Sequence, residues 1–346
     1  EEASRSLCDA ATDAGSDDNL SALILQVNDT PSETLTEAHQ RLTSQTIPPV
    51  MKPGNRIDGY VVQEVLHSST RSHAYRVRRT TDDAICVLKA PSQNFAESIQ
   101  YLEGFMLEQW VGRRIDNPQI MKIHEHEDSR FLYYIAEWVQ GETLRQWMER
   151  HPKPALDDIL PILSSLISAT RTFHRLGMVH RDLKPENVII EHDGTVKIID
   201  FGTVQVTGFS DLHTANEDVV PEGSLNYIAP EVLTGGAATN LSDLFSIGAM
   251  VYEMLAGEVP FALEDCVDLP SKPFDWTLRP LKSFRPDLPE STGTALARVL
   301  AYDPAKRPEV MTEFLQNLKD STSRRVSGEQ WQPLIQRGSV DFWRNW

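Results

Sequence analysis

The chain has 346 residues, of which 40% are hydrophobic and 24% charged, and its formal net charge is −17. These values are typical of a soluble globular protein with two domains or one two-lobed domain, and the acidic balance argues against nucleic acid as a partner. No apolar run is long enough to span a bilayer. The three cysteines stand far apart and lack metal-ligand or disulfide spacing, so we expect a reducing, cytoplasmic compartment.

The first 55 residues differ in composition from the rest. Residues 1–19 are acidic and small, and "LSALILQV" at 20–27 is an apolar run that predicts a strand. Residues 28–55 are rich in Thr, Ser, Pro and Asn with little periodicity, which predicts a linker. The chain begins at Glu1 rather than Met, so we expect further sequence upstream.

From Arg56 to residue 140 the pattern predicts strands, then one helix, then strands again. Residues 96–115 have helical spacing with charged faces. Strands are predicted at 59–66, 73–79, 84–90, 119–128 and 130–139.

Helices dominate from Gly141 to residue 318. They are predicted at 143–150, 159–177 and 242–257, around a hairpin at 187–199 in which Asp193-Gly194 is a strong turn signal. A small β-rich lobe (56–140) followed by a larger helical lobe (141–318) predicts an α+β fold with a cleft between the lobes.

Two short strings within the helical lobe carry chemistry. "HRDLKPEN" stands at 180–187 and "DFG" at 200–202, on either side of the predicted hairpin. A loop in this place presents several polar groups into one cleft. Transfer of a phosphoryl group from ATP needs cations near the phosphates, a group that accepts the proton of the incoming hydroxyl, and tight positioning.

The polar residues of these strings match those needs. Asp182 would accept the proton of the substrate hydroxyl, and Lys184 would offset charge on the transferred phosphate. Asn187 and Asp200 would hold Mg²⁺, with Mn²⁺ as an alternative, because hard cations prefer oxygen ligands. H-R-D-L-x-x-x-N followed by D-F-G is a compound motif, so chance is a poor explanation for the set.

Residues from about 56 to 318 resemble a serine/threonine protein kinase of the eukaryotic-like type found in bacteria. Beyond the two strings, the resemblance rests on "APE" at 229–231, "DLFSIG" at 243–248 and "DPAKRP" at 303–308. It implies a two-lobed protein-kinase fold, with ATP and the Ser or Thr hydroxyls of proteins as substrates. Lys184 after "HRDL" is the serine/threonine form of the motif.

The resemblance also assigns supporting roles. Asp243 would support the loop that carries the catalytic aspartate, and Arg307 would pair with Glu231. Arg181 would bind a phosphorylated residue of the activation loop, 203–228. We expect autophosphorylation in that loop, at a residue that the sequence does not identify.

The nucleotide site follows from the same resemblance. Lys89 in "CVLK" would contact the α- and β-phosphates. Three glutamates follow it, and Glu108 is its best partner because "NP" comes after it as the family's helix-ending motif does. Backbone groups of Glu137 and Val139 would bind the adenine, and the small Ala136 predicts an open pocket behind it.

The first loop of the kinase pattern departs from the family. Where G-x-G-x-x-G is expected the chain has "HSSTRS" at 67–72, with His67, Ser69 and Ser72 at the glycine positions. Two interpretations stay open. Either Ser69, Ser72 and Arg71 donate to phosphate oxygens and the enzyme works, or the protein is a pseudokinase that binds and regulates an adjoining phosphatase. The complete set of charged catalytic residues favours activity.

The string G-S-x-D-N at 15–19, followed by an apolar run, resembles the last part of a metal-dependent serine/threonine protein phosphatase. In that family Asp18 would be a ligand of the Mg²⁺ or Mn²⁺ pair. Because bifunctional bacterial proteins join such a phosphatase to a kinase, we interpret residues 1–27 as a C-terminal phosphatase remnant. An acidic tail with an Asx turn is the alternative. One Asp cannot hold a two-metal site, so this fragment is predicted to be inactive as a phosphatase.

Residues 319–346 are predicted to form a tail. "DFWRNW" at 341–346 groups three aromatic residues with an arginine, a combination found at membrane interfaces. We expect either that a membrane-spanning segment follows Trp346 in a longer product and tethers it, or that the tail docks on the kinase.

Overall fold

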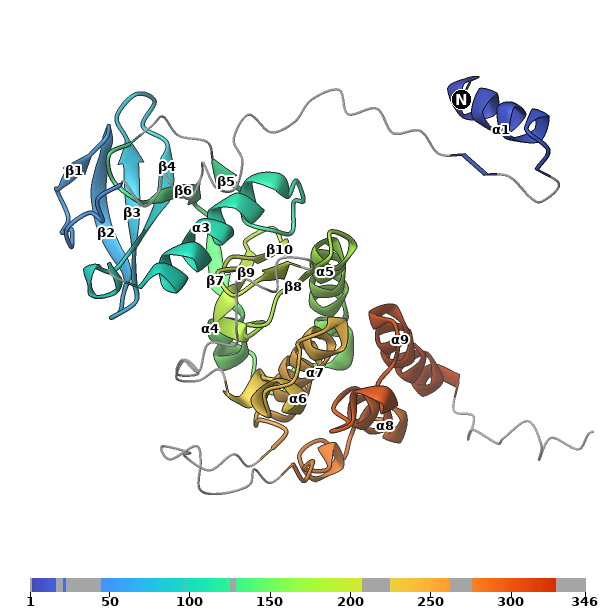
Figure 1. The fold of residues 1–346 in the computed structure, drawn as a ribbon. Coiled ribbons are helices and arrows are strands. Elements are labelled where there is room, and N and C mark those ends of the chain that lie inside the picture. The colour runs from blue at the N-terminus through green and yellow to red at the C-terminus, as the bar shows by residue number, and fades with distance from the viewer. Residues whose placement is uncertain are drawn as a thin grey trace, which may run out of the picture. The chain divides into compact units, whose positions relative to one another are not determined.

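The computed structural model describes residues 2–16, 21–22, 45–96, 98–124, 129–206, 225–261 and 276–327 (Figure 1). The chain divides into two units, Glu1–Ser44 and Gln45–Trp346. In the first unit, α1 spans Glu2–Asp13, a helix that the sequence did not predict. Asp18 and most of the strand predicted at 20–27 lie outside the described residues, and its two described residues, 21–22, are not in a strand.

The second unit begins with a six-stranded antiparallel sheet in the order β1-β2-β3-β4-β6-β5. Along β3, His73, Tyr75 and Val77 are buried and the residues between them are less so, the period of two of a strand with one covered face. The predicted strands are confirmed, although the last two are shorter than predicted. The strands are β1 (Arg56–Ile57), β2 (Tyr60–Ser68), β3 (Ser72–Arg79), β4 (Ile85–Pro91), β5 (Ile123–His124) and β6 (Tyr134–Glu137).

One long helix of this lobe, α3 (Ile99–Arg114), confirms the helix predicted at 96–115. It begins after Ser98, whose hydroxyl accepts a hydrogen bond from the Tyr101 N–H at 3.4 Å. Phe105, Glu108 and Val111 are buried along one face. The Phe105 ring lies 5.2 Å from the ring of Tyr134 on β6, so this face packs toward the sheet and carries Glu108 with it.

Residues 45–55, the last part of the linker predicted over 28–55, pack on the sheet lobe, and residues 28–44 lie outside the described residues. The Thr46 N–H donates to the Arg130 carbonyl at 2.8 Å, and the Thr46 carbonyl accepts from the Leu132 N–H at 2.9 Å. Ile47 and Met51 are only 8% and 5% exposed. The sequence pattern does not predict this packing, because these apolar residues are isolated between turns and follow neither a helical nor a strand period.

The larger lobe is mainly helical, and α7 lies at its centre because every residue from Ser242 to Ala256 is buried. The sheet and the helices α4–α9 occupy opposite ends of the unit (Figure 1), so the predicted two-lobed α+β fold is confirmed. The predicted hairpin is β9 and β10, with Gly194 in the left-handed region at φ 87°. The helices and strands are β7 (Gly141–Thr143), α4 (Leu144–Arg150), α5 (Leu156–Arg175), β8 (Met178–Val179), β9 (Val188–Glu191), β10 (Val196–Ile198), β11 (Gln205–Val206), α6 (Pro230–Leu233), α7 (Asn240–Ala256), α8 (Glu290–Val299) and α9 (Met311–Ser327).

The helix α9 continues past residue 318, so the tail predicted from 319 begins later. Leu318 is 0% exposed and Ser321 is 1% exposed, because this face of α9 keeps packing against α5 and α8. The aromatic string at 341–346 lies outside the described residues. Among the helices described here, none is long and apolar enough to cross a bilayer.

The packing of residues 45–55 makes a prediction about where the folded unit begins. A chain that starts at Arg56 should unfold at a lower denaturant concentration than one that starts at Gln45. Its free energy of unfolding should be lower by about 3 kcal/mol, because it lacks the buried side chains of Ile47 and Met51. Urea unfolding followed by tryptophan fluorescence measures the difference. Equal midpoints for the two chains would place the boundary at Arg56, as the sequence predicted.

Candidate active site

The loop His180–Asn187, here called the catalytic loop, lies between β8 and β9. Asp243 on α7 anchors it by hydrogen bonds. Asp243 is 0% exposed. Its two carboxylate oxygens accept hydrogen bonds from the backbone N–H groups of His180 and Arg181, both at 2.9 Å. Arg181 has a φ of 73°, a left-handed conformation that is strained for a residue with a Cβ. The bonds to Asp243 offset that strain and fix the turn just before Asp182.

Within the catalytic loop, three predicted residues form one hydrogen-bonded group. The Asn187 amide nitrogen donates to Asp182 Oδ2 at 2.8 Å and to the Asp182 carbonyl at 2.9 Å. Lys184 Nζ lies 2.9 Å from the same Oδ2. The side chains of Asp182 and Lys184 are 16% and 15% exposed, so both groups lie side by side and are partly accessible to solvent. This arrangement can orient a hydroxyl next to a positive charge.

A second group joins the two lobes and consists of Lys89, Glu108 and Asp200, here called the charged trio. Lys89 on β4 lies 2.8 Å from Glu108 Oε1 on α3 and 3.2 Å from Asp200 Oδ1. The ion pair predicted between Lys89 and Glu108 is therefore present. The side chain of Glu108 is 2% exposed and that of Asp200 is 41% exposed, so Asp200 is the member of the trio that faces solvent.

Burial and charge shift the pKa values of the charged trio in different directions. Burial raises the pKa of Glu108 to about 7, although the Lys89 ammonium acts against it. Burial would also raise the pKa of Asp200, but the nearby Lys89 ammonium lowers it below its ordinary value. For Lys89 burial acts downward, and the carboxylates of Asp200 and Glu108 raise the pKa well above normal. Glu108 is thus the group of the trio that titrates near neutral pH.

The oxygen donors proposed for a metal lie close together. The Ile199 N–H donates to the Asn187 carbonyl at 3.0 Å, which places Asp200, the next residue, beside the catalytic loop. Because its amide nitrogen donates to Asp182, Asn187 offers its amide oxygen to a ligand. Asp200 Oδ1 accepts from Lys89 at 3.2 Å and from the Gly202 N–H at 3.1 Å. An amide oxygen and a carboxylate oxygen fit Mg²⁺.

The segment predicted to bind adenine follows β6. Glu137 is engaged on both sides, since its N–H donates to the Lys122 carbonyl at 2.9 Å and its carboxylate accepts from Lys197 Nζ at 2.8 Å. Val139 is 5% exposed and belongs to no strand. Ala136 is 0% exposed between its cross-strand neighbours, and the open pocket behind the adenine stays a prediction.

The loop at 67–72 is closed on itself. The Ser69 N–H and hydroxyl both donate to the Ser72 carbonyl, at 3.0 and 3.2 Å. The Ser69 oxygen also accepts from the N–H groups of Arg71 and Ser72, both at 3.2 Å. The Arg71 guanidinium lies over the rings of Phe95 and Tyr101, 5.8 and 5.7 Å from their centres. Ser69 and Arg71 are thus engaged within the protein, and the expectation that they donate to phosphates stays a prediction.

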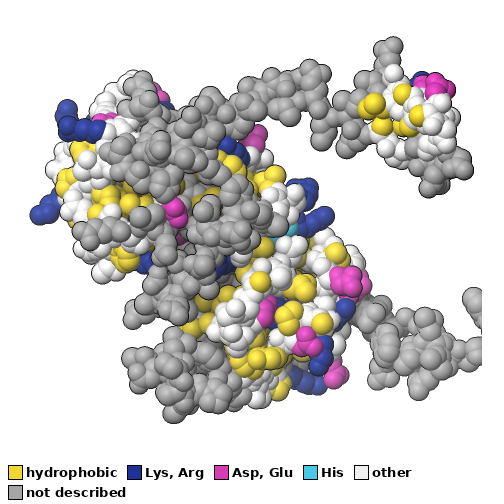
Figure 2. Space-filling view, viewed as in Figure 1, with side chains coloured by type: hydrophobic (Ala, Val, Ile, Leu, Met, Phe, Trp, Pro, Cys, Tyr) yellow, Lys and Arg dark blue, Asp and Glu magenta, His cyan; other side chains and the backbone are white. Residues whose placement is uncertain are grey.

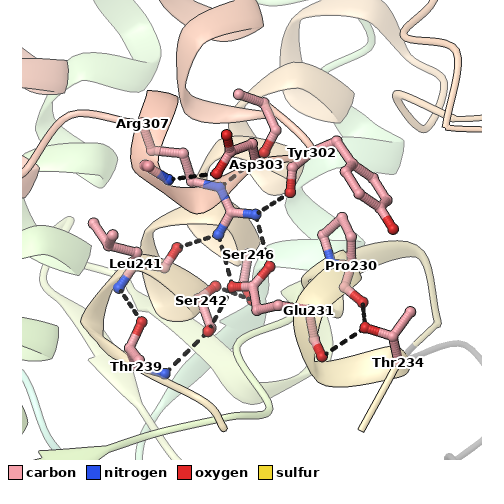
Figure 3. Close-up of polar contacts among 12 residues, drawn as sticks. Pro230, Glu231, Thr234, Thr239, Leu241, Ser242, Ser246, Tyr302, Asp303 and Arg307 are labelled. Carbon is pink, nitrogen blue, oxygen red and sulfur yellow. Dashed lines mark hydrogen bonds and ion pairs between the residues drawn. The ribbon is translucent and has the colours of Figure 1, made fainter. Parts of the chain in front are cut away.

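Glu231 and Arg307 form the ion pair that the motifs predicted (Figure 3). Two parallel contacts join Arg307 Nη1 and Nη2 to Glu231 Oε1 and Oε2, each at 2.8 Å. Arg307 also donates to the Leu241 carbonyl at 2.9 Å, and the Ser242 hydroxyl donates to Glu231 at 2.8 Å. The Arg307 side chain is 0% exposed. The pair therefore ties α6, at the end of the activation loop, to α7 and to the segment before α9.

A further cluster beside the catalytic loop was missed from the sequence. Arg145 on α4 contacts Glu186 at 2.8 Å and Glu253 on α7 at 2.6 Å, and it donates to the Tyr227 hydroxyl, which itself donates to Glu253. Lys197, the partner of Glu137, was missed as well. These pairs join residues that are far apart in sequence, and no local pattern in one sequence signals them.

The geometry and the fold together define a class of protein. Residues 60–318 match the protein kinase domain family, and the chain belongs to that family.

Named relatives are serine/threonine protein kinases of bacteria. PrkC of Bacillus subtilis is 29% identical over 77% of this chain and 41% of its own length. PknL of Mycobacterium tuberculosis is 30% identical over 72% of this chain and 62% of its own length. The chain therefore spans about 40 to 60% of these relatives. A crystal structure of the M. tuberculosis PknI kinase domain matches with a TM-score of 0.61 and 25% identity, over 79% of this chain and all of that one.

The raised pKa of Glu108 predicts that nucleotide affinity depends on pH. With a pKa of about 7, Glu108 is about one tenth ionised at pH 6 and about nine tenths at pH 8. Only the ionised form pairs with Lys89, so the affinity for ATP should rise between pH 6 and pH 8. Isothermal titration at several pH values measures it. Glu108→Gln is the control, and a wild-type profile that matches that variant would contradict the prediction.

The buried pair in Figure 3 predicts a large effect on stability. Arg307→Met leaves Glu231 without its cation and should lower the free energy of unfolding by about 3–5 kcal/mol. The matched control is Arg79→Met, because Arg79 makes the same two-point contact with Asp82 at 2.8 Å but both side chains are largely exposed. The control should change stability by less than about 1 kcal/mol. Denaturant unfolding compares the two variants, and equal losses would refute the argument from burial.

Proposed function

We propose that the chain is an ATP-dependent protein kinase that transfers the γ-phosphate of ATP to serine or threonine hydroxyls of proteins. The observation that carries the proposal is the hydrogen-bonded group of Asp182, Lys184 and Asn187 on a loop that a buried aspartate anchors. The charged trio supports it, because Lys89 of the sheet lobe and Asp200 beside the catalytic loop already lie within 3.2 Å. The relatives PrkC and PknL are serine/threonine protein kinases, which favours the same activity here.

Each group has a step in the proposed reaction. Asp182 orients the substrate hydroxyl and takes its proton as the bond to phosphorus forms, and Lys184 offsets charge on the transferred phosphoryl group. Lys89, oriented by Glu108, binds the α- and β-phosphates. Asn187 and Asp200 would hold Mg²⁺, which supplies positive charge against the phosphate oxygens when it is bound. The backbone groups of Glu137 and Val139 would bind the adenine, and Val139 is the better placed of the two because the Glu137 N–H is already used.

Loss of the carboxylate at Asp182 tests the assignment. Asp182→Asn should reduce phosphate transfer from γ-labelled ATP to a generic basic protein by at least about 100-fold, since the proton acceptor is gone. Lys89→Met should reduce transfer through weaker ATP binding. The matched control is Asp193→Asn, which makes the same chemical change in the exposed turn between β9 and β10 and should transfer phosphate as the wild type does. Undiminished transfer by Asp182→Asn would refute the assignment.

The second candidate, a pseudokinase that regulates a neighbouring phosphatase, is favoured by one observation. The loop at 67–72 lacks glycine, and its N–H groups at Ser69, Arg71 and Ser72 are satisfied within the loop. The two candidates predict different results for the wild type in the transfer assay above, because only a kinase transfers phosphate. Thermal stabilisation by ATP and Mg²⁺ without any transfer would favour the pseudokinase, because a ligand that binds only the folded state raises the unfolding midpoint.

Regulation by phosphorylation is part of the proposal. Burial lowers the pKa of Arg181, and nearby Asp243 acts against that shift. A cation with few surrounding charges favours the arrival of an anion such as a phosphorylated residue of the activation loop. Thr203 is already engaged, because its hydroxyl donates to the His180 carbonyl at 3.0 Å. The other Ser and Thr residues of the activation loop, Thr207, Ser210, Thr214 and Ser224, lie outside the described residues. Mass spectrometry of the autophosphorylated protein would identify the residue.

The remaining proposals concern partners and place in the cell. We propose that residues 1–27 are the end of a metal-dependent protein phosphatase domain, and that a tether to the membrane follows the chain. Coding sequence upstream of Glu1 tests the first proposal, which expects phosphatase metal-ligand motifs there. Coding sequence downstream of Trp346 tests the second, which expects an apolar run long enough to span a membrane. Nucleic acid is not proposed as a partner. On the face that Figure 2 shows, the described Lys and Arg side chains are dispersed among Asp and Glu rather than gathered in one patch.

A further inference from the structure

The tip of the loop at 67–72 is held by residues outside the loop, on the segment that leads from β4 into α3. The Arg71 carbonyl accepts two hydrogen bonds, one from the Ser92 N–H at 2.7 Å and one from the Tyr101 hydroxyl. Ser92 is buried, so its N–H depends on this acceptor rather than on water. Because one carbonyl is bonded to two donors of a neighbouring segment, the backbone at the loop tip is fixed against the start of α3.

The side chain of Arg71 is held by the same segment. Its guanidinium lies over the rings of Phe95 and Tyr101, and the centres of these two rings are 4.7 Å apart, so the rings form one aromatic slot. In the part of the chain that the structure describes, no carboxylate forms an ion pair with Arg71. The faces of the two rings therefore take the place of a counter-ion.

The rest of the loop is held as well. The Ser68 hydroxyl and the buried His73 Nδ1 form a hydrogen bond of 3.0 Å at the root of the loop, and the Asn94 amide nitrogen donates to the Thr70 carbonyl at 3.4 Å. A glycine loop adjusts its backbone to the phosphates of a bound nucleotide. A loop without glycine that is bonded at its root and its tip keeps the position in which it is held.

We propose that Tyr101 is a positioning residue of the nucleotide site, which holds the loop at 67–72 in the place that the phosphates of ATP require. It acts through the carbonyl and the guanidinium of Arg71, and these contacts are here called the loop latch. The inference rests on the proposed kinase function and assigns a further residue to the same site. Where the family uses a mobile glycine loop, this chain uses a loop that α3 holds in position.

The titration of Tyr101 supports its place and its role as a donor. Burial raises the pKa of Tyr101 to about 12, and the cations of Lys89 and Arg71 act against that shift. Tyr101 is thus near enough to feel both the loop tip and the lysine that would bind the phosphates. Its hydroxyl stays protonated at every pH in which Glu108 titrates, so the loop latch should hold equally at pH 6 and pH 8.

The first test measures the loop latch directly and needs no activity. Trypsin cleaves after arginine, and the peptide bond after Arg71 contains the carbonyl that Tyr101 holds. Tyr101→Phe keeps the ring and removes only the hydroxyl, so trypsin should cut the folded protein after Arg71 about 3- to 10-fold faster than in the wild type. Cleavage after the exposed Arg150, at the end of α4, is the internal standard and should not change. Equal rates of cleavage after Arg71 would overturn the proposal.

The second test asks whether the loop latch serves the phosphates. In isothermal titration Tyr101→Phe should bind ATP with Mg²⁺ about 3- to 10-fold more weakly, and it should bind adenosine as the wild type does, because adenosine has no phosphates. KM for ATP should rise by the same factor while kcat changes little. The matched control is Tyr133→Phe, which removes a hydroxyl that donates to Asp58 at 3.0 Å in the core of the sheet lobe and should bind both ligands normally. Equal losses for ATP and adenosine, or tighter ATP binding, would contradict the assigned role.

The third test separates the loop latch from direct contact between Arg71 and a phosphate. Arg71→Met removes the charge, and Tyr101→Leu removes the ring and the hydroxyl. If Arg71 acts through the aromatic slot, Arg71→Met should weaken ATP binding by less than about twofold when Tyr101→Leu is already present. Additive losses would mean that Arg71 binds phosphate by itself, and they would refute the proposal.

This inference and its premise fail in different ways. A wild type that binds ATP without transferring phosphate refutes the kinase proposal alone, because neither the cleavage after Arg71 nor the comparison of ATP with adenosine needs transfer. A wild type that transfers phosphate, with unchanged cleavage and unchanged ATP affinity in Tyr101→Phe, refutes the loop latch alone.

Discussion

The structure depends most on the contact of Lys89 with two carboxylates from different parts of the chain. Glu108 and Lys89 are almost withdrawn from water, with side chains 2% and 18% exposed, and buried charges are unfavourable unless each has its partner. The sheet, α3 and the segment after β10 must therefore all be in place at once. When all three groups are ionised, the charged trio carries one net negative charge. Burial raises the pKa of Glu108 to about 7, and the excess negative charge favours the arrival of a further cation beside Asp200.

The catalytic loop is held by a different kind of constraint. Asp243 is fully buried, yet its oxygens are satisfied by His174 at 2.8 Å and by the two N–H groups of the loop. These charge-assisted bonds keep Arg181 in a strained conformation directly before Asp182. Because α7 is buried along its length, this anchor is as rigid as the core itself. Rigid support for Asp182 is what positioning a substrate hydroxyl requires.

The sequence predicted the parts of the fold and of the site that local patterns encode. Alternating apolar residues marked β2, β3 and β4, the Asp193-Gly194 turn marked the β9–β10 hairpin, and compound motifs identified Lys89, Asp182 and Asp200. The packing of Thr46 and Ile47 was not predicted, because the residues around them follow no helical or strand period. Contacts between distant residues escaped too. Nothing near Arg145 in the sequence indicates that it meets Glu186 and Glu253.

The serine loop shows how a motif can change its residues and keep its shape. Glycine is required where the backbone is left-handed, and no residue from 67 to 72 has a positive φ. The hairpin therefore forms without glycine, and the Ser69 oxygen caps the N–H groups that a phosphate would otherwise bind. Those bonds are 3.2 Å long, at the weak end of the range for N–H donors. Releasing each costs about 0.5–1.5 kcal/mol, which a charge-assisted bond to phosphate would offset. Under the proposed function, closure of the loop on itself would weaken nucleotide binding without preventing it, and Lys89 would contribute more to that binding than it would beside a glycine loop.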